Sequence, residues 1–268
     1  MTATADPGRP TDLSPGAVVT RLRAAGCVFA EDEAELLLAA ARTPDELAAM
    51  VGRRAAGLPL EHVLGWAEFC GLRIAVDQGV FVPRRRTEHL VRRALALVSG
   101  PAPVVLDLCC GSGAVGAALA AALDGIELHA ADIDPAAVRC ARRNLGPAGQ
   151  VYEGDLYEPL PATLRGRVGI LVANAPYVPT DAIGLLPPEA RDHEPAVALD
   201  GGSDGLDVQR RVAASAHRWL APGGHLLVET SERQAPLTVA AFTAAGLATE
   251  VHTCDDLTAT VVTGTRPS

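Results

Sequence analysis

Over the first quarter of the chain, hydrophobic residues recur every three or four positions. This spacing is typical of helices that bury one face. Ser14-Pro15 predicts the start of one helix, residues 31–42 predict a second, and the capping-box sequence Thr43-Pro44-Asp45-Glu46 predicts the start of a third. We therefore expect a mobile tail over residues 1–11 and a small helical domain over residues 12–62.

The spacing then changes to an alternation of apolar and polar positions. Residues 66–82, WAEFCGLRIAVDQGVFV, alternate in this way and contain Gly71 and Gly79, which predicts a β-hairpin. We expect residues 63–82 to form a β-hairpin linker and residues 83–268 to form a second domain.

From Pro83 onward, short apolar runs alternate with longer segments of helical spacing. This order predicts an α/β domain with a mostly parallel sheet that helices cover on both faces. The last two strands have no helix between them, so at least one pair should be antiparallel. The predicted strands are 103–107, 126–131, 168–173, 224–229, 247–252 and 258–264, and the predicted helices are 87–98, 114–123, 135–144, 207–220 and 232–245.

Composition narrows the classes of function. The 268-residue chain is 49% hydrophobic, enough for a sizeable core, and it contains no lysine, which excludes Schiff-base and lysine-base mechanisms. Its net charge of -9 argues against nucleic acid as the direct substrate, because phosphate binding requires a basic surface. There is no signal-peptide pattern and no apolar run of roughly 18 residues, so we expect a cytoplasmic protein without a membrane partner. The six cysteines lack zinc or redox spacing, so we expect buried thiols and no metal site.

A glycine-rich loop follows the predicted strand at 103–107. Gly111, Gly113 and Gly116 fit the dinucleotide fingerprint, in which glycines let the backbone turn tightly and approach a ligand closely. Asp132 ends the next strand, where a carboxylate can accept hydrogen bonds from a ribose.

Two ligands are compatible with this loop, a nicotinamide dinucleotide and S-adenosylmethionine (SAM). An acid at the end of the first strand would repel a pyrophosphate, whereas it attracts the cationic ammonium group of SAM. Asp107 is such an acid and favours SAM. Asp155 follows a third short strand, where it is either a contact to the adenine amino group or a solvated loop residue.

The strand at 168–173 stops abruptly at Asn174-Ala175-Pro176-Tyr177. The carboxyl edge of an open α/β sheet is where ligands bind. An amide nitrogen is a poor nucleophile, and its methylation requires acceptors that hold both N–H groups while charge builds on the nitrogen. The Asn174 side-chain oxygen and the Ala175 carbonyl can supply two acceptors, Pro176 fixes the turn, and Tyr177 offers a flat wall.

These motifs resemble those of the SAM-dependent protein N5-glutamine methyltransferases that act on peptide-chain release factors. The resemblance runs from about Gly57 to Gly264, and the helical N-terminal region matches that family's substrate-binding domain. The similar stretches are GLPLEHVLGWAEFCGLRIAVDQGVFVPRRRTEHLV, VLDLCCGSGAVGAALA, ADIDPAAVRCARRN and ARDHEPAVALDGGSDGLD. The resemblance implies a Rossmann-like class I SAM-dependent methyltransferase domain with a seven-stranded, mostly parallel sheet. We also expect a monomer.

The resemblance also assigns residues. Asn174 and the Ala175 carbonyl would hold the glutamine amide, Pro176 would shape the turn, and Tyr177 would pack the substrate. Glu194 would brace the asparagine loop. The residues assigned to SAM are Phe81, Asp107, Cys109, Gly111, Gly113, Asp132, Ile133, Asp155, Leu156 and Asn174.

Three positions depart from the family pattern. Ala175 stands where the second residue is usually proline, Cys109 stands where glycine is usual, and Arg86 follows Arg84-Arg85 where proline and an acid are usual. A related enzyme retargeted to another protein, a peptide or a nucleobase amino group is therefore an alternative. The three arginines could form a solvated face or contact the substrate or the SAM carboxylate. A SAM-binding protein without catalysis is a further hypothesis, which Asn174 and Tyr177 oppose. A nicotinamide oxidoreductase is another, which Asp107 opposes.

Overall fold

The computed structural model describes residues 12–100 and 102–268, and the expected tail at residues 1–11 lies outside this range. The chain divides into two compact units, one ending at Gly65 and the other running from Trp66 to Ser268. Each unit has its own hydrophobic core.

The first unit is a small helical bundle, as predicted. Ser14 occupies the N-cap of the first helix without a side-chain bond, whereas the Thr43 hydroxyl accepts a hydrogen bond from the Glu46 backbone N–H at the third. A buried ion pair of Arg54 with Glu33 joins the third helix to the second. The helices are α1 (Pro15–Ala24), α2 (Ala30–Ala40), α3 (Pro44–Ala55) and the short α4 (Leu60–Leu64), which the sequence did not predict.

The second unit opens with the predicted hairpin. Strands β1 (Trp66–Phe69) and β2 (Leu72–Ala75) pair in antiparallel fashion. Cys70 and Gly71 connect them, and both have positive φ angles, as a tight hairpin turn requires. The strands end at Ala75, so the rest of the predicted hairpin segment is irregular.

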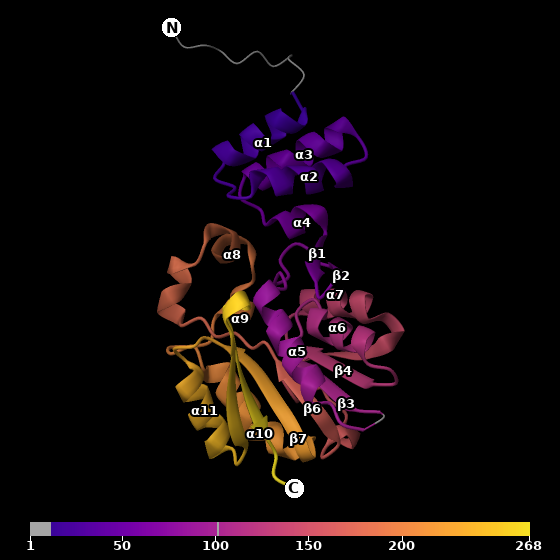
Figure 1. Cartoon of the computed structure of the whole chain (residues 1–268), viewed down its shortest axis with the longest axis vertical. Coiled ribbons are helices and arrows are strands. Elements are labelled where there is room, and N and C mark those ends of the chain that lie inside the picture. Colours follow the sequence, from indigo (N-terminus) through magenta and orange to yellow (C-terminus); the bar gives the residue numbers. More distant parts are fainter. Residues whose placement is uncertain (1–11, 101) are drawn as a thin grey trace. The chain divides into compact units, whose positions relative to one another are not determined.

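A seven-stranded sheet forms the centre of this unit, and its strand order is β5-β4-β3-β6-β7-β9-β8. Figure 1 labels its central strands β4, β3, β6 and β7. The first five strands of the sheet are parallel, and β9 runs antiparallel to both β7 and β8, which confirms the predicted fold class. The strands are β3 (Val104–Leu108), β4 (Glu127–Asp132), β5 (Gly149–Glu153), β6 (Val168–Ala173), β7 (Leu220–Thr230), β8 (Ala248–Cys254) and β9 (Ala259–Thr265).

Helices cover both faces of the sheet because alternate strand residues are apolar on each side. On one face Val105 and Ile170 pack with α5, α6 and α7. On the other face Leu106 and Leu171 pack with α10 and α11. The helices are α5 (Glu88–Leu97), α6 (Ala114–Ala122), α7 (Pro135–Leu145), α10 (Asp207–Trp219) and α11 (Ala235–Ala244), with 3₁₀ turns at Arg85–Thr87 (η1), Gly146–Ala148, Ala162–Leu164 and Asp255–Leu257.

The segment between β6 and α10 contains short helical pieces that no sequence pattern predicted. They are η4 (Thr180–Leu185), α8 (Pro188–His193) and α9 (Ala196–Leu199). Val178 pairs with Asp200 in an isolated bridge, which joins the start of this segment to its end. The segment therefore returns to the carboxyl edge of the sheet, beside the end of β6.

Candidate active site

The strand order reverses direction at β3. This strand pairs with β4 on one side and with β6 on the other, so the chain connections leave its carboxyl end in opposite directions. Ligands of open α/β sheets bind in the crevice that such a reversal leaves. Asp107, Asp132 and Asn174 lie at the carboxyl ends of these three strands.

The glycine loop between β3 and α6 is held by the two acidic residues. The Gly111 backbone N–H donates to Asp132 Oδ2 over 2.8 Å, and the Gly116 N–H donates to Asp107 Oδ2 over 3.0 Å. Gly111 and Gly113 have φ angles of +55° and +77°, a conformation that side chains disfavour. Cys109 adopts a similar positive φ of 55°. The loop is therefore shaped by backbone conformation and by carboxylates at the ends of β3 and β4.

A cavity opens above this loop, and we call it the glycine-loop cavity. It contains every residue that the sequence assigned to SAM except Gly113, which instead packs closely against Ala141 of α7. Its lining is Phe69, Phe81, Pro83, Thr87, Asp107, Cys109, Cys110, Gly111, Ser112, Ala114, Val115, Asp132, Ile133, Asp134, Ala137, Asp155, Leu156, Asn174, Pro176, Pro195, Val197, Ala198, Val208 and Arg211.

Asp107 is a buried acid without a cationic partner in the described part of the chain. Its side chain lines the cavity although the residue is only 2% exposed. Burial raises the pKa of Asp107 to about 7, and the neighbouring Asp132 carboxylate adds to this shift. A cationic group in the cavity would restore the charged form, so the site fits the ammonium end of SAM.

Asp132 and Asp155 occupy the same cavity in different electrostatic states. Burial raises the pKa of Asp132, while backbone N–H groups of Asp134 and Gly111 oppose the shift. Asp155 forms an ion pair with Arg211 of α10, at 2.5 Å between Oδ2 and Nη2. Arg211 lines the cavity too, although sequence analysis did not single it out, because one arginine on a polar helix face carries no motif.

A second cavity lies on the other side of Asn174 and Pro176, and we call it the Tyr177 cavity. Phe81, Asn174, Pro176 and Ala198 line both cavities, so these residues form the wall between them. Its lining is Phe81, Arg84, Arg86, Asn174, Ala175, Pro176, Tyr177, Val178, Leu186, Pro187, Glu189, Ala190, Glu194, Ala198 and Leu199. All four residues of the Asn-Ala-Pro-Tyr motif therefore meet at one place.

The Asn174 side chain has a defined orientation. Its Nδ2 donates to Thr87 Oγ1 over 3.4 Å, which leaves Oδ1 as the acceptor end. Within the described residues no hydrogen bond reaches Oδ1 or the Ala175 carbonyl. Two consecutive residues therefore carry an acceptor without a hydrogen bond from the described residues, Asn174 at the shared wall and Ala175 in the Tyr177 cavity.

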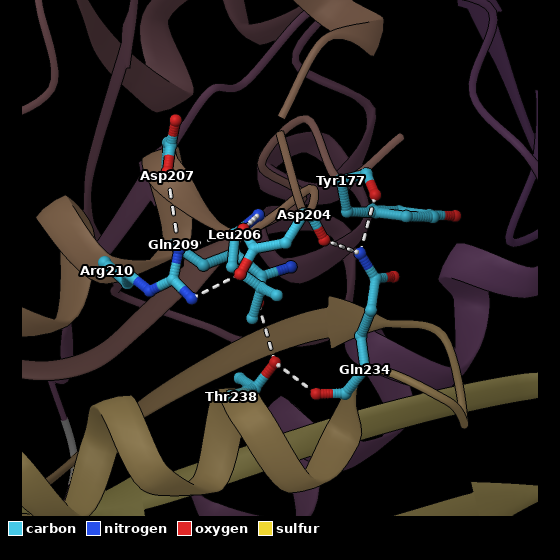
Figure 2. Close-up of polar contacts among 8 residues, drawn as sticks. All are labelled: Tyr177, Asp204, Leu206, Asp207, Gln209, Arg210, Gln234 and Thr238. Atoms are coloured by element: carbon cyan, nitrogen blue, oxygen red, sulfur yellow. Dashed lines mark hydrogen bonds and ion pairs between the residues drawn. The ribbon is translucent and has the colours of Figure 1, made fainter. Parts of the chain in front are cut away.

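Tyr177 is fixed at both of its ends. Its hydroxyl donates to Glu229 Oε1 over 3.2 Å. Its backbone carbonyl accepts a hydrogen bond from Gln234 Nε2 over 2.9 Å, and the same nitrogen donates to the Asp204 carbonyl over 3.0 Å (Figure 2). A Cβ atom at Gly205 would lie 2.3 Å from the Tyr177 carbonyl oxygen, so only glycine permits this close approach.

The three consecutive arginines Arg84, Arg85 and Arg86 do not all line the same cavity. Arg84 pairs with Glu194, with Nη2 2.6 Å from both carboxylate oxygens, and lies over the Phe81 ring. Glu194 also accepts a hydrogen bond from the Val82 N–H, so it braces the segment that carries Phe81. Arg85 lies at a different surface hollow beside Glu88, whereas Arg84 and Arg86 both line the Tyr177 cavity.

The described residues were compared with the requirements of a metal site, a disulfide and a membrane-spanning helix. Across residues 12–100 and 102–268, no group of three or more histidine, cysteine or acidic side chains is arranged to hold a metal ion. All six cysteines are in the described range and none forms a disulfide, but only Cys27, Cys110 and Cys140 are buried. No helix in the described part of the chain is long and apolar enough to cross a membrane.

Comparisons with known proteins agree with this geometry. Residues 73–184 match the family model of the methyltransferase small domain. The chain is 40% identical to the release factor glutamine methyltransferase of Geobacter sulfurreducens over 81% of its own length and 75% of the relative. It is also 40% identical to the enzyme of that name from Mycolicibacterium smegmatis, over 88% and 85%.

Another relative has a different substrate in its name. The 4-amino-L-phenylalanine/4-methylamino-L-phenylalanine methyltransferase of Streptomyces pristinaespiralis is 36% identical over 88% of this chain and 84% of its own. Among solved structures, a methyltransferase from Pyrococcus furiosus is similar in fold, with a TM-score of 0.56 and 15% identity over 82% of this chain and 98% of the other.

Proposed function

The chain belongs to the family of release factor glutamine methyltransferases, and on that basis we propose that it transfers a methyl group from SAM to the side-chain amide nitrogen of a glutamine in a peptide-chain release factor. The observation that carries the proposal is the wall shared by the two cavities. Asn174 and Pro176 face both, so a cofactor on one side and an acceptor amide on the other would meet at this wall.

SAM supplies an electrophilic methyl group on a positively charged sulfur when it is bound. The residues that would hold it are those of the glycine-loop cavity. Asp107 is placed for the ammonium group, Asp132 for the ribose hydroxyls, and Asp155 for the adenine amino group. Phe81, Ile133 and Leu156 supply apolar walls. The ion pair with Arg211 leaves the second oxygen of Asp155 available as an acceptor.

The acceptor side requires no strong base. An amide nitrogen becomes acidic only as the new bond forms, so the site must hold both N–H groups and favour the positive charge that develops. Asn174 Oδ1 and the Ala175 carbonyl are the acceptors for these two N–H groups. Tyr177 packs against the planar amide, and its hydroxyl is engaged with Glu229, so it acts as a wall in this proposal.

We extend the proposal to the rest of the chain. The N-terminal helical domain, expected from the sequence over residues 12–62, would bind the substrate protein. We also propose that the protein acts as a monomer. Sedimentation of the purified protein at assay concentration tests the oligomeric state.

The decisive experiment uses labelled SAM, purified release factor and a release-factor variant whose target glutamine is replaced. We expect one methyl group per wild-type factor and none on the variant. SAM binding without transfer to the wild-type factor would refute the proposed substrate.

A second acceptor belongs in the same assay. The relative named for 4-amino-L-phenylalanine and the alanine at position 175 favour testing an aromatic amine. Methylation of 4-amino-L-phenylalanine in preference to the release factor would show that the acceptor of this chain is an aromatic amine and not the glutamine amide.

A further inference from the structure

One buried acid, Glu229, has so far been described only as the acceptor of the Tyr177 hydroxyl. Glu229 is the penultimate residue of β7 and is only 1% exposed. Its neighbour Val228 pairs with Ala173, the last residue of β6. Glu229 therefore lies beside the point where β6 gives way to Asn174. It lines neither cavity, so it does not contact a bound substrate directly.

The Glu229 carboxylate has one direct contact to the motif. Tyr177 donates its hydroxyl proton to Oε1 over 3.2 Å, while Oε2 has no hydrogen bond from the described residues. A buried carboxylate with one oxygen left without a hydrogen bond is costly, so its presence at this place requires an explanation.

A second connection runs through Thr87, which is 2% exposed. Thr87 Oγ1 accepts a hydrogen bond from Asn174 Nδ2, so its own proton must point elsewhere. The nearby carboxylate of Glu229 attracts that proton, and the interaction with Thr87 lowers the pKa of Glu229 against the effect of burial. The hydroxyl of Thr87 thus has a preferred direction, from Asn174 toward Glu229.

We propose that Glu229 is a positioning residue of the acceptor site, orienting Tyr177 directly and Asn174 through Thr87. The inference rests on the proposed function, because it concerns the same acceptor amide. The two ends of an asparagine amide have nearly the same shape. A flipped Asn174 would turn an N–H donor toward the N–H groups of the acceptor. Glu229 prevents the flip because its charge holds the Thr87 proton and leaves an acceptor for Asn174 Nδ2.

The arrangement predicts a specific dependence on pH. The groups whose charge or hydrogen bonds act on Glu229 are Thr87, Arg86 and Tyr177, and all three favour the carboxylate, whereas burial raises the pKa of Glu229. When pH falls through the raised pKa, Glu229 takes up a proton and no longer directs the Thr87 hydroxyl. At saturating SAM, kcat should therefore decline on the acidic side.

The first test is Glu229→Gln, assayed with whichever acceptor the wild-type enzyme methylates. We expect kcat to fall about 100-fold, as a misplacement of about 1 Å can cost. The affinity for SAM should stay the same, and the acidic decline of kcat should disappear. An unchanged kcat, or an acidic decline of the same shape as in the wild type, would overturn the proposal.

The second test separates orientation from stability with two threonines. Thr87→Val removes the hydroxyl that links Asn174 to Glu229. Thr230→Val is the matched control, since Thr230 is 4% exposed, follows Glu229 in β7, and accepts a hydrogen bond from Thr238 and none from a residue of the motif. Only Thr87→Val should lower kcat, and it should have little further effect in the Glu229→Gln background. Equal losses in both valine variants would show a merely structural role.

A third measurement does not depend on the acceptor. Burial and then the charge of Glu229 raise the pKa of the Tyr177 phenol. Glu229→Gln should shift the near-ultraviolet absorbance of the Tyr177 phenol at neutral pH, because the hydroxyl then donates to a neutral amide oxygen instead of a carboxylate, with Tyr177→Phe identifying the signal. If no tested acceptor is methylated but the Tyr177 absorbance shifts, the proposed function fails while the contact stands. An unchanged Tyr177 absorbance overturns the positioning role itself.

Discussion

The glycine-loop cavity and the Tyr177 cavity share a wall but are built in different ways. Most polar groups of the first lie at or just after the carboxyl ends of β3, β4 and β5, and Thr87, Asn174 and Arg211 add to them from other elements. The second draws on η1, the loop after β6, and the short helices α8 and α9. Regular strands fix the position of the turns at their ends, whereas the irregular segment depends on contacts between distant residues. The comparison teaches that local sequence places most polar groups of the glycine-loop cavity, whereas tertiary packing shapes the Tyr177 cavity.

The substitution that should best distinguish the roles of the two cavities is Asn174→Ala. Removing an acceptor aimed at developing charge should lower kcat by about 100- to 1,000-fold. The Kd for SAM, measured by calorimetry, should change little, because the glycine loop is held by Asp107 and Asp132 instead.

The only other asparagine gives the matched control for this variant. Asn144 of α7 donates to the carbonyls of Ser112 and Ala75, so it supports the glycine loop. Asn144→Ala should weaken SAM binding and leave kcat at saturating SAM nearly intact. If both variants affected the same parameter, the division into two cavities would be wrong.

Asp132→Ala should affect the glycine-loop cavity and therefore the binding of SAM. Loss of charge-assisted hydrogen bonds to the ribose should weaken SAM binding by about 1–3 kcal/mol, which is about 5- to 150-fold in Kd. Asp132→Asn keeps one oxygen and should lie between the wild type and the alanine variant. A Kd for SAM that does not move in either variant would remove Asp132 from the cofactor site.

Asp107 gives the glycine-loop cavity a dependence on pH. With a pKa raised to about 7, Asp107 is protonated below neutrality in the SAM-free protein. Affinity for the SAM ammonium group should therefore decrease as pH falls below about 7, approaching tenfold per pH unit if one proton is released on binding. Asp107→Asn should bind SAM weakly at every pH, and a persistent pH dependence in that variant would point to another group.

The same shift has a consequence for stability. The folded-state pKa of Asp107 lies above its unfolded value, so the folded SAM-free protein binds the proton more tightly. The stability that the protonated Asp107 gives the folded protein is fully present below the unfolded-state pKa and is lost as pH rises through about 7. Thermal unfolding with and without SAM should show that the cofactor stabilises most strongly above neutrality.

Sequence patterns predicted the regular part of the fold well. The strand at 168–173 has the predicted bounds, and the helix after Thr43 begins where the capping box indicates. Acids that end apolar strands, such as Asp107, were recognisable for the same reason. Glu229 carries that signal too, since it closes the predicted strand at 224–229, but no motif next to it drew attention.

The remainder depends on packing that no local pattern encodes. Gln234 reaches the Tyr177 carbonyl from 57 residues away, and Arg211 reaches Asp155 from 56 residues away. The short helices α8 and α9 lack a long apolar stripe, because they cover a cavity and do not fill a core. Sequence analysis could therefore find the Asn-Ala-Pro-Tyr motif without finding the residues that hold it.

The smallest expected effect is that of Ala175→Pro, and it tests how much the acceptor side depends on those distant contacts. Ala175 is 1% exposed, and its contribution to the site is a backbone carbonyl. Proline would restrict φ at this position and favour extended backbone at Asn174, which removes freedom that the chain otherwise loses on ordering. Because Tyr177 is already fixed by Glu229 and Gln234, we expect kcat/KM for the release factor to rise only about 2- to 5-fold, matching the 0.4–1 kcal/mol that such substitutions contribute. A large fall in kcat/KM for the release factor, with SAM affinity unchanged, would instead mean that the Tyr177 cavity is shaped around alanine for another acceptor.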